Sequence, residues 1–206
     1  MEDQIFFIHP TAIVEPGATI ENGVEIWHFS HVMQAAKIGK DCVLGQNVFI
    51  GEGVIVGSRV KIQNNVSIYK GVTLEDDVFI GPSAVFTNVI NPRSFINRKS
   101  EFKNTIIRKG ATIGANATIL CGIEVGAYAM VGAGTVVVKS VLPFEMIVGN
   151  PARQLGWVSR NGYVLKFDDS GRAFCQEEGG FYRLKNGFVE VENQQDSDVP
   201  IPSNSV

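Results

Sequence analysis

The chain is poor in histidine and cysteine, with three of each among its 206 residues. All three histidines, His9, His28 and His31, lie in the first part of the sequence. The cysteines are odd in number and have neither disulfide nor metal-ligand spacing, which predicts a reducing compartment. Cys175 has no histidine or second cysteine nearby. We therefore expect a cytoplasmic protein with no metal site.

The sequence also lacks a long apolar run and an excess of positive charge. No apolar segment approaches the roughly 20 residues needed to cross a bilayer, and we expect no signal peptide. The formal net charge is −3 and the isoelectric point is about 5.6. These values argue against nucleic acid or an anionic membrane as the main partner.

Aliphatic residues, in contrast, recur at a fixed spacing of six. The first series is Ile8, Val14, Ile20, Ile26, Val32, Ile38, Leu44, Ile50, Val56, Ile62, Ile68, Leu74 and Ile80, followed by Phe86. The second series is Ile107, Ile113, Ile119, Val125, Val131 and Val137. This period fits neither a helix nor a single strand, and it is typical of a parallel β-helix in which each hexad forms one short face and a corner. We predict an all-β hexapeptide-repeat solenoid over residues 1–155.

Two segments depart from the period. Residues 91–105 are polar and basic, which predicts a loop insertion at one corner of the solenoid, where functional loops are presented. Residues 156–206 form a C-terminal extension with a predicted β-hairpin at Asn186-Gly187 and a disordered end. Because a solenoid has open ends and flat faces, we expect a homotrimer that packs prism faces together.

Several motifs carry a family resemblance. The segments Gly45–Phe49, Lys61–Tyr69, Gly81–Arg93 and Lys109–Asn116 resemble the nucleotide-sugar N-acetyltransferases of the hexapeptide-repeat acyltransferase family. The stretch Phe86-Thr-Asn-Val-Ile-Asn-Pro-Arg93, with Arg98-Lys99-x-Glu101, is most similar to the branch that acts on UDP-2-acetamido-3-amino-2,3-dideoxyglucuronate for bacterial surface polysaccharides such as O-antigen.

The resemblance implies a left-handed β-helix, a trimer, and acetyl-coenzyme A as the acyl donor in clefts between neighbouring prisms. It places the donor along the C-terminal coils. The residues expected to contact the donor are Gly114, Ala115, Gly132, Ala133, Lys139, Asn150, Pro151 and Arg153.

The position of the histidines bears on the reaction. Hydroxyl acetylation generally needs a histidine base, whereas a neutral sugar amine is already nucleophilic. No histidine lies on the coils with the specific motif, although His28 and His31 could reach a neighbouring subunit's site. We therefore favour N-acylation, with Asn88 as the central catalytic residue whose amide oxygen accepts a hydrogen bond from the attacking amine.

The insertion supplies the predicted acceptor-binding groups. Arg93, Arg98 and Lys99 suit a pyrophosphate or a sugar carboxylate, and Asn91 is a further expected substrate contact. Glu101 is expected to order the loop by pairing with Arg93 or Arg98. Gln63, Asn64, Asn65 and Tyr69 are expected near the same corner, where they would bind uracil, ribose or sugar hydroxyls. A solvated loop and a structural asparagine ladder are the alternative interpretations.

Three other functions remain open at this stage. A dTDP-3-amino-3,6-dideoxyhexose N-acetyltransferase would share almost every motif. A γ-type carbonic anhydrase needs three histidines on adjacent coils around zinc, which the histidine positions disfavour. A non-catalytic β-helix assembly subunit would not require the specific polar insertion.

Overall fold

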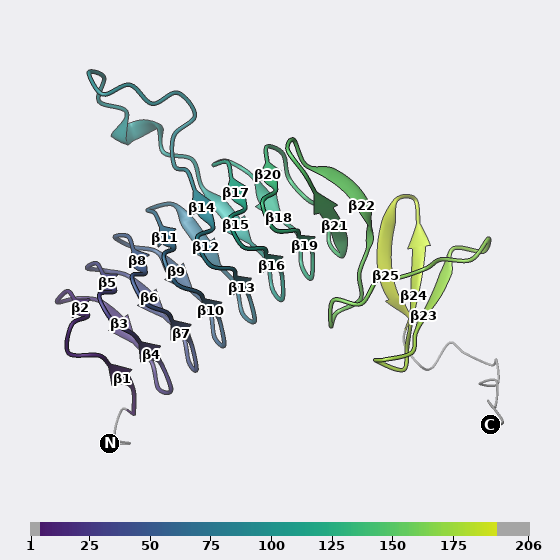
Figure 1. The fold of residues 1–206 in the computed structure, drawn as a ribbon, viewed down its shortest axis with the longest axis horizontal. Helices are drawn as coiled ribbons and strands as arrows, with labels where there is room; N and C mark the ends of the chain where they lie inside the picture. Colours follow the sequence, from purple (N-terminus) through teal and green to yellow (C-terminus); the bar gives the residue numbers. More distant parts are fainter. Residues whose placement is uncertain (1–4, 193–206) are drawn as a thin grey trace.

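The computed structural model describes residues 5–192 and is built almost entirely of short β-strands. Most of them wind into a three-sided parallel β-helix, shown edge-on in Figure 1. This arrangement confirms the predicted all-β class and the solenoid with its corner insertion. Within the described residues, no helix is long and apolar enough to traverse a bilayer.

Three sheets form the sides of the prism. Sheet A contains β1 (Phe7–Ile8), β4 (Glu25–Ile26), β7 (Val43–Leu44), β10 (Lys61–Ile62), β13 (Phe79–Ile80), β16 (Thr112–Ile113), β19 (Met130–Val131), β21 (Glu145–Val148) and β22 (Arg153–Trp157). Sheet B contains β2 (Ile13–Val14), β5 (His31–Val32), β8 (Phe49–Ile50), β11 (Ser67–Ile68), β14 (Val85–Phe86), β17 (Thr118–Ile119) and β20 (Val136–Val137). Sheet C contains β3 (Thr19–Ile20), β6 (Lys37–Ile38), β9 (Ile55–Val56), β12 (Val72–Leu74), β15 (Thr105–Ile107) and β18 (Glu124–Val125).

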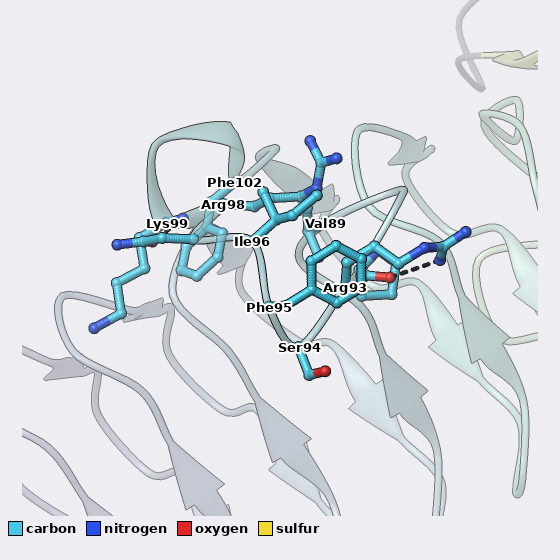
Figure 2. A pocket seen from close by; sticks show the side chains of 10 residues that line it. Val89, Arg93, Ser94, Phe95, Ile96, Arg98, Lys99 and Phe102 are labelled. Carbon is cyan, nitrogen blue, oxygen red and sulfur yellow. Dashed lines mark hydrogen bonds between the residues drawn. The ribbon is translucent and has the colours of Figure 1, made fainter.

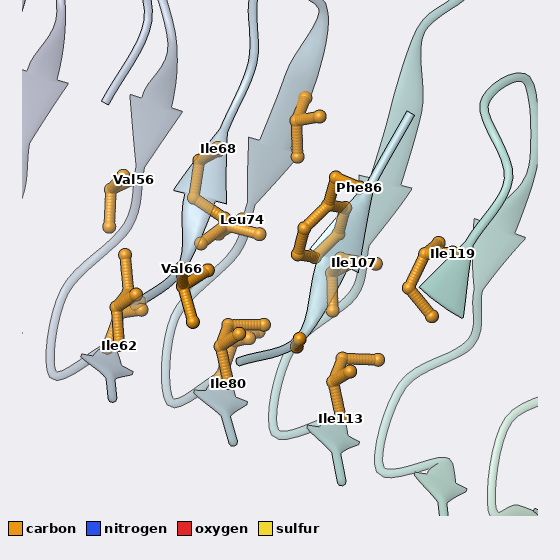
Figure 3. Packing of buried hydrophobic residues seen from close by; sticks show 14 of the residues in the cluster. Val56, Ile62, Val66, Ile68, Leu74, Ile80, Phe86, Ile107, Ile113 and Ile119 are labelled. Carbon is orange, nitrogen blue, oxygen red and sulfur yellow. The ribbon is translucent and has the colours of Figure 1, made fainter. Parts of the chain in front are cut away.

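The repeated aliphatic residues form the interior of the prism. Successive strand residues point to opposite sides, so in β13 Phe79 faces out and Ile80 faces in. Ile62, Ile80 and Ile113 stack in a row along sheet A (Figure 3), and each is fully buried. Burying one such side chain stabilises the fold by about 1.5–3 kcal/mol. The core of the prism is therefore one continuous column of aliphatic side chains.

The corners between the sheets also follow from the sequence. We call them corners AB, BC and CA, after the sheets that they join in chain order. Asn47, Asn65 and Asn116 occupy equivalent places at corner AB with φ of 58°, 62° and 57°, a left-handed conformation that asparagine tolerates well. Cys42 fills an interior position beside corner CA, where burial raises the pKa of its thiol to about 11. This confirms that Cys42 is a packing residue.

The insertion lengthens one turn of the solenoid. Ser67 pairs with Phe49, 18 positions before it, whereas Phe86 pairs with Ile119, 33 positions after it. The loop leaves the prism after β14 and returns at β15, so it spans residues 87–104 and extends well beyond corner BC (Figure 1). It contains one short 3-10 helix, Lys99–Glu101. Thr105, predicted to lie in the insertion, instead begins β15 and is buried.

The C-terminal extension is a three-stranded antiparallel sheet of β23 (Arg172–Cys175), β24 (Gly180–Lys185) and β25 (Phe188–Glu192). The predicted hairpin joins β24 to β25, and Asn186 and Gly187 both have positive φ, as a tight two-residue turn requires. The expected domain boundary after residue 155 falls inside β22, which pairs with β21 of the prism. The end predicted to be disordered lies outside the described residues.

A second hydrophobic core attaches this sheet to the end of the prism. Phe144, in the last coil, stacks on Tyr128 at 5.3 Å and meets Tyr182 edge-on at 5.9 Å between ring centroids. Tyr182 is almost fully buried with Leu165, Ala173, Cys175 and Val189. The extension therefore covers apolar surface at the open C-terminal end of the solenoid, as such folds require.

One carboxylate links the loop before the sheet to its core. Glu178 accepts hydrogen bonds from the Ser159 hydroxyl, from the Asn161 N–H at 2.6 Å and from the Tyr182 hydroxyl at 2.5 Å. Burial opposes ionisation of Glu178, but these three donors outweigh it and lower its pKa. Burial and the nearby carboxylate raise the pKa of Tyr182 to about 12. Ionised Glu178 therefore stabilises this contact.

We expect Glu178→Gln to lower the free energy of unfolding of the extension by about 1–3 kcal/mol at pH 7, because the buried donors lose their charged acceptor. Since the folded pKa is lowered, the stabilisation is present above the unfolded pKa of about 4.3 and disappears as the pH falls through the folded value. Urea unfolding followed by Trp157 fluorescence at several pH values measures it. Glu190→Gln, on the exposed side of the same sheet, is the control. An equal effect of both variants would contradict the assignment.

Candidate functional site

Corner BC brings together the predicted residues that follow strands of sheet B. Tyr69 follows β11, Asn88 follows β14 and Lys139 follows β20, so the three lie along one edge of the prism. The insertion leaves from the same edge and carries Asn91, Arg93, Arg98, Lys99 and Glu101. The structure thus places most of the predicted polar and basic site residues at one corner.

Asn88 lies at the base of the insertion and is half-buried. Its carbonyl oxygen accepts a hydrogen bond from the Lys103 N–H at 3.0 Å, which holds the two ends of the loop together. The side-chain amide takes no part in the hydrogen bonds of residues 5–192. Its oxygen and NH₂ group therefore remain available to a bound molecule.

The insertion folds around an open hollow of about 690 Å³, seen in Figure 2. Arg93 and Lys99 extend from opposite sides of it. Arg98 is paired with Glu101 at 2.8 Å, which agrees with one of the two expected ways of ordering the loop. Arg93 bonds the Pro92 carbonyl oxygen at 2.8 Å, and no carboxylate of the described chain pairs with it or with Lys99. The hollow thus presents two positive charges that can meet an anion.

The lining of the hollow also includes apolar side chains. Phe95 is 83% exposed, and Ile96 and Phe102 lie beside it. Sequence reasoning missed these residues because scattered apolar positions in a polar loop have no period. The run of aromatic and aliphatic residues between the basic ones was the available signal.

The expectation that Gln63, Asn64 and Asn65 share a corner with Tyr69 is wrong. They follow β10 and lie at corner AB, because six residues separate Gln63 from Tyr69 and one hexad ends at one corner. Asn64 Oδ1 accepts a hydrogen bond from the Gln46 main-chain N–H at 2.8 Å. Asn65 Oδ1 accepts one from the side-chain amide of Asn47 at 3.1 Å. Both asparagines thus form part of a structural ladder, although they remain exposed.

Half of the predicted donor-binding residues, Gly114, Ala115, Gly132 and Ala133, also lie at corner AB, further along the prism. Coil stacking requires a glycine at position 114, because a Cβ there would lie 2.5 Å from the Ala133 nitrogen. The Gly114 and Gly132 N–H groups bond to the neighbouring coil. Within the described chain, the N–H groups of Ala115 and Ala133 have no acceptor. They lie one rung apart, about 4.8 Å, and can meet the carbonyl oxygens of an extended ligand.

The remaining predicted donor residues lie near the end of the prism. Asn150 and Pro151 are exposed and follow β21. Lys139 and Arg153, 14 positions apart in sequence, line one cavity of about 120 Å³ with Ser140, Glu145 and Gln154. The Glu145 carboxylate accepts a hydrogen bond from the Leu142 N–H at 2.7 Å. Two cations at one small cavity suit a phosphate group.

The structure does not bring His31 to Asn88. His31 lies on β5 and is separated from β14 by three steps in sheet B, about 14 Å at the usual strand spacing. Its Nε2 contacts Glu15 Oε1 at 2.8 Å, and hydrogen bonds from the Gln34 N–H and from His31 lower the pKa of Glu15. His9 and His28 stack at 3.5 Å between ring centroids in the first two coils. Among residues 5–192, no group of three or more histidine, cysteine or acidic side chains is placed to hold a metal ion.

Comparison with known proteins agrees with this architecture. The family model described as bacterial transferase hexapeptide (six repeats) matches residues 17–52 and 104–139, on either side of the insertion. The hexapeptide repeat of succinyl-transferase matches residues 36–70. Over these matched segments, the β-helix of this chain is similar to the hexapeptide-repeat acyltransferases.

Curated relatives narrow the similarity. The chain is 46% identical over 88 residues to a dTDP-3-amino-3,6-dideoxy-alpha-D-galactopyranose 3-N-acetyltransferase of Aneurinibacillus thermoaerophilus, covering 43% of this chain and 45% of that protein. It is 40% identical over 92 residues to a serine acetyltransferase of Buchnera aphidicola, covering 45% of this chain and 31% of that protein. The chain thus spans less than half the length of these relatives.

A hexapeptide-repeat acetyltransferase of Vibrio cholerae, solved in complex with acetyl-coenzyme A, is a structural neighbour of this chain. It superimposes with a TM-score of 0.54 and 27% identity over 61% of this chain and 72% of the other. A maltose O-acetyltransferase of Clostridium difficile has the same fold, with a TM-score of 0.52 and 24% identity over 59% and 69% of the two chains.

Proposed function

We propose that this chain transfers an acetyl group from acetyl-coenzyme A to the 3-amino group of a nucleotide-linked sugar. The observation that carries this proposal is the 46% identity to a dTDP-sugar 3-N-acetyltransferase in a chain with the hexapeptide-repeat fold. The insertion at corner BC supports it, because its two unpaired cations suit an anionic acceptor. Such products serve the assembly of bacterial surface polysaccharides.

The available amide of Asn88 supports N-acylation. A neutral amine attacks the thioester carbonyl when the two are held within roughly 3–3.5 Å, so positioning supplies most of the catalysis. The Asn88 oxygen accepts a hydrogen bond from the attacking amine and orients its lone pair. The C–S bond breaks as the amide forms, and the amine proton leaves with the thiolate. No imidazole is required, which suits a corner about three rungs from His31.

The separation of the predicted residues between two corners supports a site shared by two copies. At the level of Asn88, corner AB carries Pro82, with Asn64 one rung before it and Ala115 one rung after it. If parallel prisms associate about a threefold axis, corner AB of one copy faces corner BC of the next at equal height. The side-chain amide of Asn64, expected to bind the acceptor, would then lie on one side of Asn88. The main-chain amides of Ala115 and Ala133, expected to bind the donor, would lie on the other side.

Sheet B is the face best suited to contact between copies. Its outward residues are Ile13, His31, Phe49, Ser67, Val85, Thr118 and Val136, with no lysine, arginine or acidic residue among them. Sheet C and its corner instead carry ion pairs, such as Arg108 with Glu75 and Glu124, each at 2.7 Å. Burying an uncharged face costs less desolvation. We propose a homotrimer built on sheet B.

A second candidate acceptor is UDP-2-acetamido-3-amino-2,3-dideoxyglucuronate. Arg93 and Lys99 favour it, because Glu101 neutralises Arg98 and leaves these two cations for a pyrophosphate and a uronate carboxylate. The dTDP-linked 3-amino-3,6-dideoxyhexose has no carboxylate to occupy the second cation. The 46% sequence identity to the dTDP-sugar 3-N-acetyltransferase favours the dTDP-linked sugar as the acceptor instead.

A thiol-release assay with acetyl-coenzyme A and a panel of UDP- and dTDP-linked aminosugars tests the function and separates the two acceptors. We expect rapid release with a 3-amino sugar and little with its 3-hydroxy counterpart. Arg93→Gln should raise the KM for the uronate more than the KM for the dideoxyhexose. Release with hydroxyl acceptors alone, or with none, would overturn the proposal.

Asn88→Ala should lower kcat by on the order of 100-fold, comparable with the loss of one preorganised polar group at a reacting centre. The KM for acetyl-coenzyme A should change little, because Asn88 is placed on the acceptor amine. Steady-state kinetics measure both constants, and light scattering verifies that the oligomer is intact. Near-normal turnover would refute the role of Asn88.

Val85→Arg should break the proposed trimer, because it places a charge in the uncharged sheet B contact. Ile55→Arg on sheet C is a matched control, since both native side chains are 48% exposed at equivalent outward positions. We expect light scattering to give a smaller mass for Val85→Arg only, with loss of activity. A smaller mass for Ile55→Arg alone would contradict the sheet B contact and indicate that the copies associate through sheet C.

A further inference from the structure

The insertion interrupts the hydrogen bonding between coils at corner BC. In earlier coils, N–H groups at this corner donate to main-chain carbonyl oxygens of the preceding coil, as Ala35 does to Gly17 at 3.2 Å and Gly53 to Gln34 at 3.3 Å. After β14 the chain leaves the prism, so the coil above loses that regular neighbour. The Gly122 N–H occupies this place in the next coil, whereas the Cys121 N–H is equivalent to that of Gln34, which donates to Glu15 Oε2 at 3.0 Å.

Two threonine hydroxyls accept hydrogen bonds from these two N–H groups, and Thr105 does so in place of a main-chain carbonyl. The Cys121 N–H donates to Thr87 Oγ1 at 2.9 Å, and the Gly122 N–H donates to Thr105 Oγ1 at 3.2 Å. Thr87 is the first residue after β14 and Thr105 is the first residue of β15, so they mark the two ends of the loop. Thr105 is one of only four buried polar residues in the described chain.

The loop ends are also held from the coil below and across the loop. The Thr105 N–H donates to the Gly71 carbonyl at 2.9 Å, and the Lys103 N–H donates to the Asn88 carbonyl at 3.0 Å. A Cβ on Gly71 would lie 3.2 Å from Asn104 Oδ1, and one on Gly122 would lie 3.1 Å from Lys103 Cδ. The returning chain is therefore packed closely between two coils.

We propose that Thr87 and Thr105 are positioning residues that act through Asn88. Thr87 directly precedes Asn88 in the chain, and its hydroxyl holds the backbone at the start of the loop to the following coil. Thr105 holds the end of the loop to the same coil. Together they set the height of the Asn88 amide along the prism, relative to the donor-binding coils. This inference rests on the proposed function of Asn88.

The test uses Thr87→Val and Thr105→Val, which remove the acceptor oxygen with little change in shape, and Thr87→Ser, which retains it. A misplacement of about 1 Å can cost on the order of 100-fold in rate, so we expect each valine variant to lower kcat by 10- to 100-fold. The KM for acetyl-coenzyme A should not change, and Thr87→Ser should keep near-normal kcat. Thr112→Val, on the outward side of sheet A, is the control.

A double-mutant cycle separates positioning from a general loss of stability. If Thr87 acts through Asn88, adding Thr87→Val to Asn88→Ala should lower kcat little further. Additive losses, or full activity of Thr87→Val, would overturn the inference and leave the proposed function intact.

Amide hydrogen exchange keeps the two proposals distinguishable. The Cys121 and Gly122 amides should be protected in the native chain, and the valine variants should speed their exchange at least 10-fold. If the native chain acetylates no acceptor, the proposed function fails. The catalytic role inferred for Thr87 and Thr105 then fails as well. If the valine variants leave the exchange rates of the Cys121 and Gly122 amides unchanged, the threonine hydrogen bonds themselves are also excluded.

Discussion

Coil-on-coil stacking of hexads is the constraint on which the rest of this molecule depends. Each turn places one inward apolar side chain on each of three sides, and main-chain hydrogen bonds tie it to the turns above and below. A strand cannot gain or lose one residue within a sheet without exchanging the inside and outside positions of the residues that follow. Extra residues can therefore leave only at a corner, which is where residues 87–104 depart.

This constraint gives the candidate site its two-sided character. The strands are short and rigid, so a side chain's level and corner follow directly from its place in the repeat. Asn88 and the basic loop occupy one corner, while the amides of Ala115 and Ala133 occupy another. A single prism separates these groups by the width of sheet B. The proposed association of copies through that uncharged sheet would bring the two groups together.

The two ends of the solenoid are treated differently in the described chain. At the C-terminal end, the sheet of β23–β25 supplies its own aromatic core, which packs against Phe144 and is held by Glu178. At the opposite end, Phe7 and Trp27 pack against each other at 5.3 Å and remain partly exposed, as do the first inward residues Ile8 and Val14. The core is thus most complete in the central coils, which carry the insertion.

The amino-acid sequence by itself determined the all-β solenoid, the inward positions, the insertion and the turn at Asn186-Gly187, because each depends on local periodicity or turn chemistry. It could not place Asn64 and Tyr69 relative to one another correctly, since that required assigning each hexad to a corner. Only the tertiary structure selected Arg98 over Arg93 as the partner of Glu101, joined Lys139 and Arg153 at one cavity, and bonded Thr87 and Thr105 to the next coil. The last two sets of contacts depend on which residues the winding brings to the same level, and no local pattern encodes that.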